Sequence, residues 1–372
     1  MQMNFNLDAD FERVVNIKVV GVGGGGGNAV NRMIDSGMKS VEFLSMNTDS
    51  VALHGSKATY KFQLGSKLTK GQGAGGYPER GQRAAEETRD EIAAGLKGTD
   101  LVFITAGMGG GTGTGAAPVV AEIAQELGIL TVGIVTKPFV FEGRRRMEQA
   151  EMGITALRDH VDALLIIPNE RLKHVTEEKI TLLNAFTMAD EVLRQAVQSI
   201  SDLINIPGVV NLDFSDVTAI MKGAGYAHMG MGRASGKDKA RTAALQAISS
   251  PLLETSINGA RGVIVNITAS SDIGLDEVDI ASSMIHDATH PDVNLIWGVA
   301  YDDALTDEMI VTVIATGFEL EANMQIDYNF KSPAKADAPQ GSPAEAPKAE
   351  TEGSEDDDDD FIKILDIFNR KK

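Results

Sequence analysis

Two glycine-rich segments carry the residues best suited to chemistry in this chain. One reads GVGGGGGNAV at residues 21–30, and the other reads ITAGMGGGTGTGAAP at residues 104–118. Glycine permits positive φ angles and lets a ligand approach the main chain, so that exposed N–H groups bind anions. Thr112 and Thr114 add hydroxyl donors. Because each segment follows an apolar, strand-like run, the pair predicts a polyphosphate held from two sides; tight turns packed with small residues are the alternative.

The identity of the phosphate ligand is narrowed by what the chain lacks. Gly21, Gly23 and Gly26 match a dinucleotide-binding fingerprint, with Asp49 placed to contact a ribose, but this match is weak within a run of five glycines. A P-loop requires Gly-Lys followed by Ser or Thr, and the chain has no such sequence. An NAD-type dehydrogenase would also need a hydride-transfer site, for which no suitable His–Asp pair is found. The remaining interpretation is a nucleotide-binding site that is built from two glycine-rich loops and lacks the lysine of a P-loop.

A pair of carboxylates is the second chemical candidate. The sequence NLDFSDV at residues 211–217 brings Asp213 and Asp216 within three positions of each other and adds the amide of Asn211. A lone Asp-x-x-Asp pattern is a weak signal and is most often a helix cap or a solvated turn. The residues alone therefore assign no chemical role to this pair.

The elements that must position these residues are strands that alternate with helices. Nearly continuous apolar runs rich in β-branched residues are typical of strands buried on both faces. Such runs occupy residues 16–22, 41–47, 101–107, 130–136 and 162–169. Helix-like stretches at 81–98 and 116–128 lie between them. This repetition predicts a parallel sheet that binds its ligand at the carboxyl ends of the strands.

The second half of the chain predicts a long helix and a smaller domain. Apolar residues recur at helical spacing over residues 178–204, and Pro207 and Gly208 end this helix. From about residue 225 we expect an α+β domain. Its predicted strands occupy residues 260–269, 294–302 and 308–319, and its predicted helices lie near residues 237–249 and 275–287.

Composition restricts the partners of this chain. Its 372 residues carry a formal net charge of −19, which disfavours binding to nucleic acid or anionic lipid. The absence of cysteine excludes disulfides and cysteine-ligated zinc and fits a reducing cytosol. The N-terminus lacks a signal-peptide pattern, and no apolar run approaches the roughly 20 residues that span a bilayer. We therefore expect a cytoplasmic protein without direct membrane insertion.

The C-terminal segment changes composition near residue 331. It becomes rich in Pro, Ala and charged residues and ends in an aspartate run, which predicts a disordered acidic linker over residues 321–360. The tail that follows, Phe361–Lys372, reads FIKILDIFNRKK and is apolar with a basic end. That pattern is suited to folding onto a partner, and a frayed terminus is the alternative.

Taken together, these motifs resemble the tubulin/FtsZ family of GTPases. GGGTGTG at residues 109–115 is similar to the family's signature loop, and GVGGGGGNAVNRM, MNTDS, KPFVFEGRRR and NLDFSDV fall in the family's order across roughly residues 15–320. The linker, the short tail and the lack of cysteine fit FtsZ better than tubulin. The resemblance implies a GTPase that assembles head to tail into protofilaments of the bacterial division ring at mid-cell. A GTP-binding scaffold filament with weak or no hydrolysis is the alternative.

The resemblance also implies roles for individual residues. Phe186 corresponds to the ring that stacks on guanine, and Asp190 and Asn169 correspond to readers of its edge. Glu142 and Arg146 correspond to ribose and phosphate contacts, although residues four apart also form ion pairs on helix surfaces. The other implied contacts to GTP or GDP are Gly24, Gly25, Gly26, Gly27, Asn28, Gly111, Thr112, Gly113, Asn47, Asp49 and the loop at residues 73–79.

For catalysis, the resemblance implies a site shared between subunits. Asp213 and Asp216 would act on the γ-phosphate of the neighbour's GTP, and Asn211 would orient their loop. Mg²⁺ would be held mainly by phosphate oxygens and water. The tail at Phe361–Lys372 resembles the peptide that binds membrane-tethering and regulatory division proteins.

Two departures from the family pattern stand out. In the tail, Asp366-Ile367 runs straight into Phe368 without the usual proline. In the third nucleotide loop, Gln72 replaces an apolar residue, and Gly76-Tyr77 replaces an Ala-Asn pair. We expect the first to change the tail's affinity for its partner and the second to alter nucleotide exchange or hydrolysis.

The predicted fold is a Rossmann-like parallel-sheet GTP-binding domain with a long central helix, a smaller α+β domain and a disordered tail. The expected parts are an N-terminal extension over 1–14, a GTP-binding domain over 15–177, the central helix over 178–204, a catalytic loop and connector over 205–224, a C-terminal domain over 225–320, the linker over 321–360 and the partner-binding peptide over 361–372.

Overall fold

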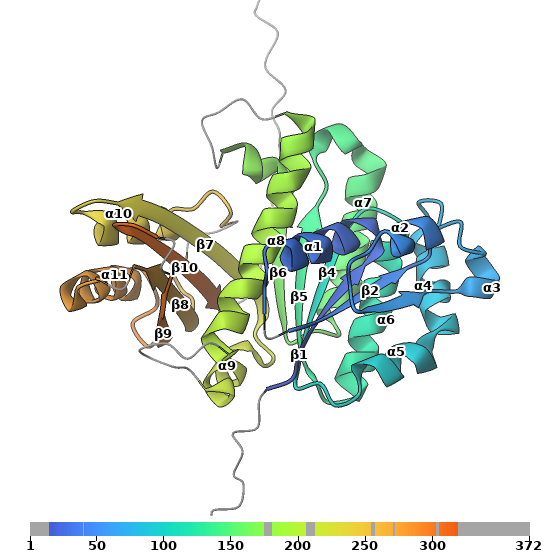
Figure 1. Ribbon diagram of the computed structural model, residues 1–372, viewed down its shortest axis with the longest axis horizontal. Coiled ribbons are helices and arrows are strands. Elements are labelled where there is room, and N and C mark those ends of the chain that lie inside the picture. The colour runs from blue at the N-terminus through green and yellow to red at the C-terminus, as the bar shows by residue number, and fades with distance from the viewer. Residues whose placement is uncertain are drawn as a thin grey trace, which may run out of the picture. The chain divides into compact units, whose positions relative to one another are not determined.

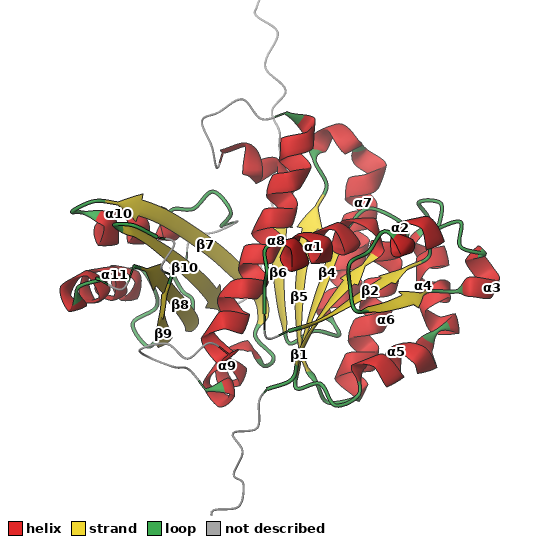
Figure 2. Ribbon diagram, viewed as in Figure 1, coloured by secondary structure: helices red, strands yellow, loops and turns green. Residues whose placement is uncertain are grey.

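Ten strands of the described chain form one sheet, in the order β3-β2-β1-β4-β5-β6-β7-β10-β8-β9 (Figure 1, Figure 2). The structure is a computed structural model, and it describes residues 15–318 except 40, 175–180, 206–212, 254–256, 271 and 303–304. The predicted extension over 1–14, the start of the predicted central helix, Asn211, and the linker and peptide over 321–372 lie outside the described residues.

The N-terminal half of the sheet is parallel, as predicted. Its strands are β1 (Ile17–Val22), β2 (Glu42–Asn47), β3 (Tyr60–Gln63), β4 (Leu101–Gly107), β5 (Leu130–Lys137) and β6 (Ala163–Pro168). Every pairing among these strands is parallel. The strands β1 and β5 are buried along their whole length, because helices cover both faces of the sheet.

Different helices cover the two faces of this parallel sheet. On one face, Val19 and Phe103 pack in a cluster with side chains of α1 (Gly23–Asp35) and α8 (Leu182–Asn205). On the other face, Val20 packs with α4 (Pro78–Glu87), α5 (Arg89–Leu96), α6 (Thr112–Glu126) and α7 (Arg144–Arg158). None of the described helices is long and apolar enough to cross a membrane.

The strand β7 (Gly225–Ser235) joins the parallel strands to the second half of the sheet. Its residues 225–227 pair in parallel with β6, and its residues 228–235 pair antiparallel with β10 (Glu308–Thr316). The remaining elements are β8 (Gly262–Ala269), β9 (Asn294–Tyr301), α10 (Lys239–Ile248) and α11 (Leu275–Asp287). They share their own core of buried residues, which confirms the predicted smaller α+β domain.

Three predicted elements were wrong in part. The single helix expected over 81–98 is two helices that meet at Thr88, whose hydroxyl donates to the Ala84 carbonyl at 3.0 Å. The helix expected from residue 116 already begins at Thr112, and the glycine run 23–27 forms the first turns of α1 instead of a loop. The strands β3 and β7 were not predicted, because β3 has four residues and glycine and polar residues interrupt the apolar pattern of β7.

The chain that follows α9 (Phe214–Met221) lies at the amino-terminal edge of the parallel strands. Asp162 directly precedes β6, and its carbonyl accepts a hydrogen bond from the Gly225 N–H at 3.0 Å. The short helix α9 lies just before Gly225, at the lower end of α8 in Figure 1. The glycine-rich turns follow the carboxyl ends of β1 and β4. The 24-residue helix α8, about 36 Å long, therefore runs from one end of the sheet toward the other.

Candidate functional site

A cavity of about 220 Å³ lies where β2 ends and α6 begins. It joins the first turn of α1, the end of β2, the loop before α4 and the start of α6. Its lining residues are Gly24, Asn47, Thr48, Asp49, Ala52, Gly73, Ala74, Gly75, Gly76, Gly111 and Thr112. The structure thus brings together five of the predicted nucleotide contacts.

The two glycine-rich turns pack directly against each other. A Cβ on Gly23 would lie 2.8 Å from the Gly113 nitrogen, and a Cβ on Gly25 would lie 3.2 Å from the Gly107 backbone. A Cβ on Gly26 would lie 2.3 Å from the Thr105 carbonyl oxygen. These glycines are needed for close packing between α1, β4 and α6, which is the alternative that the sequence left open.

Gly24 and Gly27 differ from their neighbours. A Cβ on Gly24 would meet no atom within 4 Å, and Gly24 lines the cavity. A Cβ on Gly27 would meet only the Ser45 hydroxyl, at 3.7 Å. No packing requirement explains glycine at these two positions, so their open backbone is available to a ligand. Asn28 is also exposed.

Two threonines fix the turn between β4 and α6. The Thr114 hydroxyl accepts a hydrogen bond from the Gly109 N–H at 2.8 Å, where the chain turns with a φ of 97°. The hydroxyls of Thr112 and Thr48 lie 2.6 Å apart, which ties the start of α6 to the end of β2. The free N–H groups and positive dipole end of α6 therefore border the cavity, an arrangement that favours phosphate.

Asn47 and Asp49 shape the end of β2. The Asp49 Oδ1 atom caps α2 (Ser50–His54) by accepting hydrogen bonds from the Val51 and Ala52 N–H groups at 2.8 and 3.2 Å. The Asn47 Oδ1 atom accepts a hydrogen bond from the Asp49 N–H at 3.1 Å. These bonds hold a carboxylate and an amide at the cavity wall.

Three phenylalanine rings gather near the start of α8. Phe139 is buried and stacks on Phe141 with 5.1 Å between ring centroids, and Phe186 of α8 lies edge-on to both. Phe141 and Phe186 are 57% and 41% exposed. Exposed rings on a fixed aromatic base offer a stacking surface to a planar ligand.

Asp190 lies one helical turn beyond Phe186. Burial raises the pKa of Asp190 to about 6, and the nearby Arg32 guanidinium of α1 acts in the opposite direction. Within the described residues, the buried Arg32 Nε and Asn169 Oδ1 atoms have no hydrogen-bond partner. Buried polar groups without partners are costly, so a ligand that supplied an acceptor to Arg32 or an N–H donor to Asn169 would be favoured.

Glu142 and Arg146 pair with each other at the start of α7. The Glu142 carboxylate also accepts a hydrogen bond from the Phe139 N–H at 2.9 Å, which closes the short turn η1 (Val140–Glu142). The Glu142 side chain is 10% exposed, whereas that of Arg146 is 53% exposed. The ion pair considered as an alternative is therefore present, and it leaves part of the Arg146 guanidinium accessible to a ligand.

Asp213 and Asp216 lie at the start of α9, away from the cavity. Asp213 is the N-cap residue of α9, and its Oδ1 atom accepts a hydrogen bond from the Asp216 N–H at 2.8 Å. Both residues are exposed. Asp213 is therefore a helix cap, as the alternative interpretation of the sequence expected. Within one subunit, neither carboxylate lines the cavity.

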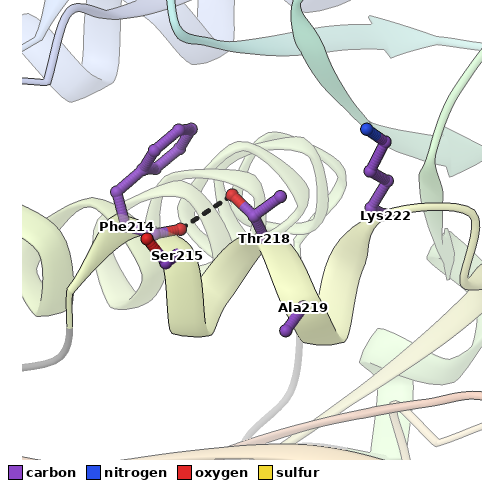
Figure 3. A pocket seen from close by; sticks show the side chains of 5 residues that line it. All are labelled: Phe214, Ser215, Thr218, Ala219 and Lys222. Carbon is purple, nitrogen blue, oxygen red and sulfur yellow. Dashed lines mark hydrogen bonds between the residues drawn. The ribbon is translucent and has the colours of Figure 1, made fainter.

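An open hollow of about 580 Å³ follows the exposed face of α9 (Figure 3). Phe214, Thr218 and Lys222 project from the same side of the helix, and the Thr218 hydroxyl donates to the Phe214 carbonyl at 2.7 Å. Ser215 and Ala219 complete the lining. An apolar ring on a hollowed surface is suited to contact with another protein chain, because aromatic side chains are enriched at such interfaces.

Sequence reasoning missed four residues of this region. They are Arg32, Thr48, Phe139 and Phe141. Arg32 follows Asn28 by one helical turn, so its place on α1 was open to prediction from spacing. Nothing in the sequence indicated that Phe139 and Phe141 would meet Phe186, because the contact joins elements far apart in the chain.

This geometry defines an α/β nucleotide-binding protein whose phosphate site is built from two glycine-rich helix N-termini. The sequence matches the family model for the tubulin/FtsZ family GTPase domain over residues 16–177, and that for the FtsZ family C-terminal domain over residues 225–319. The chain belongs to the FtsZ branch of the tubulin/FtsZ family, and it is a GTPase that binds guanine nucleotides.

Solved structures agree with this assignment. FtsZ from M. jannaschii, solved as an empty dimer, is 41% identical with a TM-score of 0.80, over 82% of this chain and 89% of that chain. A variant of FtsZ from M. jannaschii is 40% identical with the same TM-score, over 82% and 92% of the two chains. CetZ2 from Haloferax volcanii, solved as a GTPγS-bound protofilament, shares the fold at 20% identity with a TM-score of 0.68, over 81% and 92%.

Proposed function

We propose that this protein forms head-to-tail protofilaments and hydrolyses each GTP at the contact between two subunits. The observation that carries the proposal is that the cavity and the carboxylates of Asp213 and Asp216 lie apart within one subunit, which we interpret as two half-sites. The cavity lies at the carboxyl ends of the parallel strands, whereas Asp213 and Asp216 lie at the start of α9, toward the opposite edge of the sheet. A neighbour stacked end to end joins the half-sites, and a contact between unlike faces builds a filament instead of closing.

GTP occupies the cavity and the aromatic surface in this proposal. Phe186 stacks on guanine, and Asp190 and Asn169 read its edge. Glu142 and Arg146 contact ribose and phosphate. The phosphates lie against the helix N-termini. The full set of proposed contacts is Gly24, Gly25, Gly26, Gly27, Asn28, Asn47, Asp49, Gly111, Thr112, Gly113, Glu142, Arg146, Asn169, Phe186 and Asp190.

Mg²⁺ fits the donors that line the cavity. Hydroxyls of Thr48 and Thr112 and the carboxylate of Asp49 are oxygen donors, which Mg²⁺ prefers. We propose that the ion is held mainly through phosphate oxygens and water, with these side chains contacting its waters. When bound, the ion offsets negative charge on the β- and γ-phosphates.

The neighbour's α9 supplies the hydrolytic groups. Asp213 and Asp216 position and polarise the attacking water, and Asn211, which lies outside the described residues, orients the loop. Phosphate loss then removes charge and contacts from the interface. The weakened contact releases subunits, so nucleotide state controls assembly.

A scaffold filament that binds GTP with weak or no hydrolysis is the second candidate. The observation that favours it is the Asp213 cap on α9, because capping alone gives that carboxylate a structural role. The two candidates differ in a single measurable property, the release of phosphate upon assembly.

The finer organisation and cellular role are also proposals. We assign residues 15–177 to GTP binding, 178–204 to the central helix, 205–224 to the catalytic loop and 225–320 to the C-terminal domain. The tail at Phe361–Lys372 binds membrane-tethering and regulatory division proteins through an apolar segment with a basic end. The protein then acts in the cytoplasm, at the mid-cell ring of a bacterium.

Mixed filaments test the shared site. An Asp213→Asn subunit should bind GTP but fail to serve its neighbour, whereas an Asp190→Ala subunit should serve its neighbour but bind GTP poorly. Each variant alone should release little phosphate. A mixture should regain activity, because an Asp190→Ala subunit supplies an intact α9 to the GTP of an Asp213→Asn subunit. A mixture with no more activity than the sum of its parts would contradict the proposal.

A further inference from the structure

The loop at residues 73–77 is tied to α7, which also carries Arg146, one of the proposed ribose and phosphate contacts. The Gln149 side chain of α7 donates a hydrogen bond to the Gly76 carbonyl at 3.1 Å. The Arg145 guanidinium carbon of α7 lies 5.4 Å from the centroid of the Tyr77 ring. This loop forms one wall of the cavity, so these two contacts connect that wall to the helix that begins beside Glu142.

Tyr77 stands at a position that its side chain does not suit. It is the N-cap residue of α4, Pro78 follows at the first helical position, and no side-chain capping bond is made. Ser, Thr, Asp and Asn are preferred at an N-cap because their oxygen accepts a helix N–H. Tyrosine forgoes that bond. The residue is 53% exposed, and its ring contacts Arg145 instead.

The conformation of this loop depends on its glycines and on contacts with neighbouring elements. Gly73, Gly75 and Gly76 adopt φ angles of 82°, 65° and 76°, which side chains other than glycine rarely adopt. The loop also packs closely on the phosphate turn, since a Cβ on Gly111 would lie 2.9 Å from the Tyr77 nitrogen. A movement of Tyr77 therefore changes the wall against which the phosphates lie.

We propose that Tyr77 is a positioning residue whose stack with Arg145 holds the loop closed over the phosphates and slows nucleotide release. The inference rests on the proposed function, in which this cavity holds the β- and γ-phosphates. A cation over an aromatic face is attracted by the ring quadrupole. Release of nucleotide requires the loop to separate from α7, and that separation breaks the stack.

Nucleotide release from the full-length protein tests this proposal. GDP with a fluorescent methylanthraniloyl group is bound at a protein concentration below the assembly threshold and displaced with excess GDP. Tyr77→Asn should release it about two- to fivefold faster, the factor that an exposed cation–π contact supplies. Its unfolding temperature should stay equal or rise, because asparagine restores a side-chain cap. A purely structural role for Tyr77 would instead lower stability.

Four further variants complete the design. Tyr77→Phe keeps the ring and should release nucleotide at the original rate. Arg145→Ala should match Tyr77→Asn, and the double variant should be no faster than either. Arg144→Ala is the matched control, because Arg144 is 92% exposed and pairs with Glu148 on the same helix; its release rate should not change.

Three results would overturn the inference. Release from Tyr77→Asn at the original rate, with normal binding, would contradict the role of Tyr77 and leave the proposed function intact. Additive effects of Tyr77→Asn and Arg145→Ala would show that the two residues do not act through each other. Failure of the unaltered protein to bind the labelled GDP would overturn the proposed function and this inference together.

Discussion

The Asp162 carboxylate accepts a hydrogen bond from the Gly223 N–H at 3.2 Å. Asp162 stands directly before β6, so this bond fixes the chain that leaves α9 to the amino-terminal edge of the parallel strands. The nucleotide cavity lies beyond the other ends of those strands. One subunit therefore cannot apply Asp213 or Asp216 to its own cavity without unfolding this connection, which is the structural basis of the shared site that we propose.

Asp213→Asn separates the capping role of this residue from its proposed catalytic role. Asparagine keeps an oxygen for the Asp216 N–H, so α9 should keep its stability, whereas Asp213→Ala should lose about 1 kcal/mol of capping energy. Both variants should bind GTP normally and release phosphate at least about tenfold more slowly, because the carboxylate charge is gone. Phosphate release and nucleotide titration measure the two effects, and loss of GTP affinity in a folded Asp213→Asn protein would show that this loop is misplaced.

Two glycines of α1 should respond in opposite ways to alanine. Gly24→Ala adds a methyl group to open space, so stability should hold or rise by up to about 1 kcal/mol while GTP affinity falls. Gly26→Ala places its methyl group against the Thr105 carbonyl and should destabilise the fold by about 1–3 kcal/mol. Denaturant unfolding and nucleotide titration of both variants check this. Unchanged GTP affinity in Gly24→Ala would remove Gly24 from the nucleotide site.

The raised pKa of Asp190 predicts that the protein without nucleotide loses stability as pH rises. Burial raises this pKa from 3.8 to about 6 in the folded state, so the folded state binds the proton more tightly than the unfolded state, and stability is lost as pH rises from about 4 to about 6. Asp190→Asn removes that cost. The variant should gain about 1–2 kcal/mol in free energy of unfolding above pH 6, after allowance for partial exposure, and little near pH 4.

Asp202→Asn is the matched control for Asp190→Asn. Burial also raises the pKa of Asp202 to about 6, but Asp202 lies three turns further along α8. Its replacement should therefore give the same pH dependence of unfolding and leave GTP binding unchanged, whereas Asp190→Asn should weaken GTP binding. Urea unfolding at several pH values without nucleotide, followed by GTP titration, distinguishes the two. Equal GTP affinity in both variants would contradict the guanine-reading role of Asp190.

Removal of residues 331–372 should separate catalysis from recruitment. The described fold ends at residue 318, so the truncated protein should keep its GTPase activity within about twofold, a change of under 1 kcal/mol in barrier. It should fail to bind a membrane-tethering division protein. Phosphate release and co-sedimentation with vesicles that carry such a tether measure both properties, and loss of hydrolysis in the truncation would assign the tail to the catalytic unit.

Much of the fold was predictable because its signals are local. Buried parallel strands such as β1 and β5 appear as continuous apolar runs, and glycine-rich turns follow β1 and β4. The strand β7 was missed because its burial comes from partners on both sides and not from its own hydrophobicity. Tertiary pairing decides such strands, and one sequence without pairing information does not contain that signal.

The candidate site also contains features that could be predicted from the sequence and features that could not. Phe186 and Asp190 stand four residues apart, a spacing that places both on one face of a helix, so this local relationship was open to prediction from the sequence. The roles of individual glycines were not predictable, since Gly24 and Gly26 are identical in type and differ only in what surrounds them. The contact of Tyr77 with Arg145 joins a loop and a helix separated by more than 60 residues, and no sequence periodicity indicates it.

Specific GTPase activity as a function of protein concentration tests the shared site most directly. Phosphate release per subunit is measured with Mg²⁺ alongside light scattering, from well below to well above the concentration at which scattering begins. The shared site predicts near-zero activity per subunit at low concentration and a rise together with scattering. Activity per subunit that is constant from the lowest concentration would show that each subunit has a complete site, and the assignment of Asp213 and Asp216 to a neighbour's GTP would be wrong.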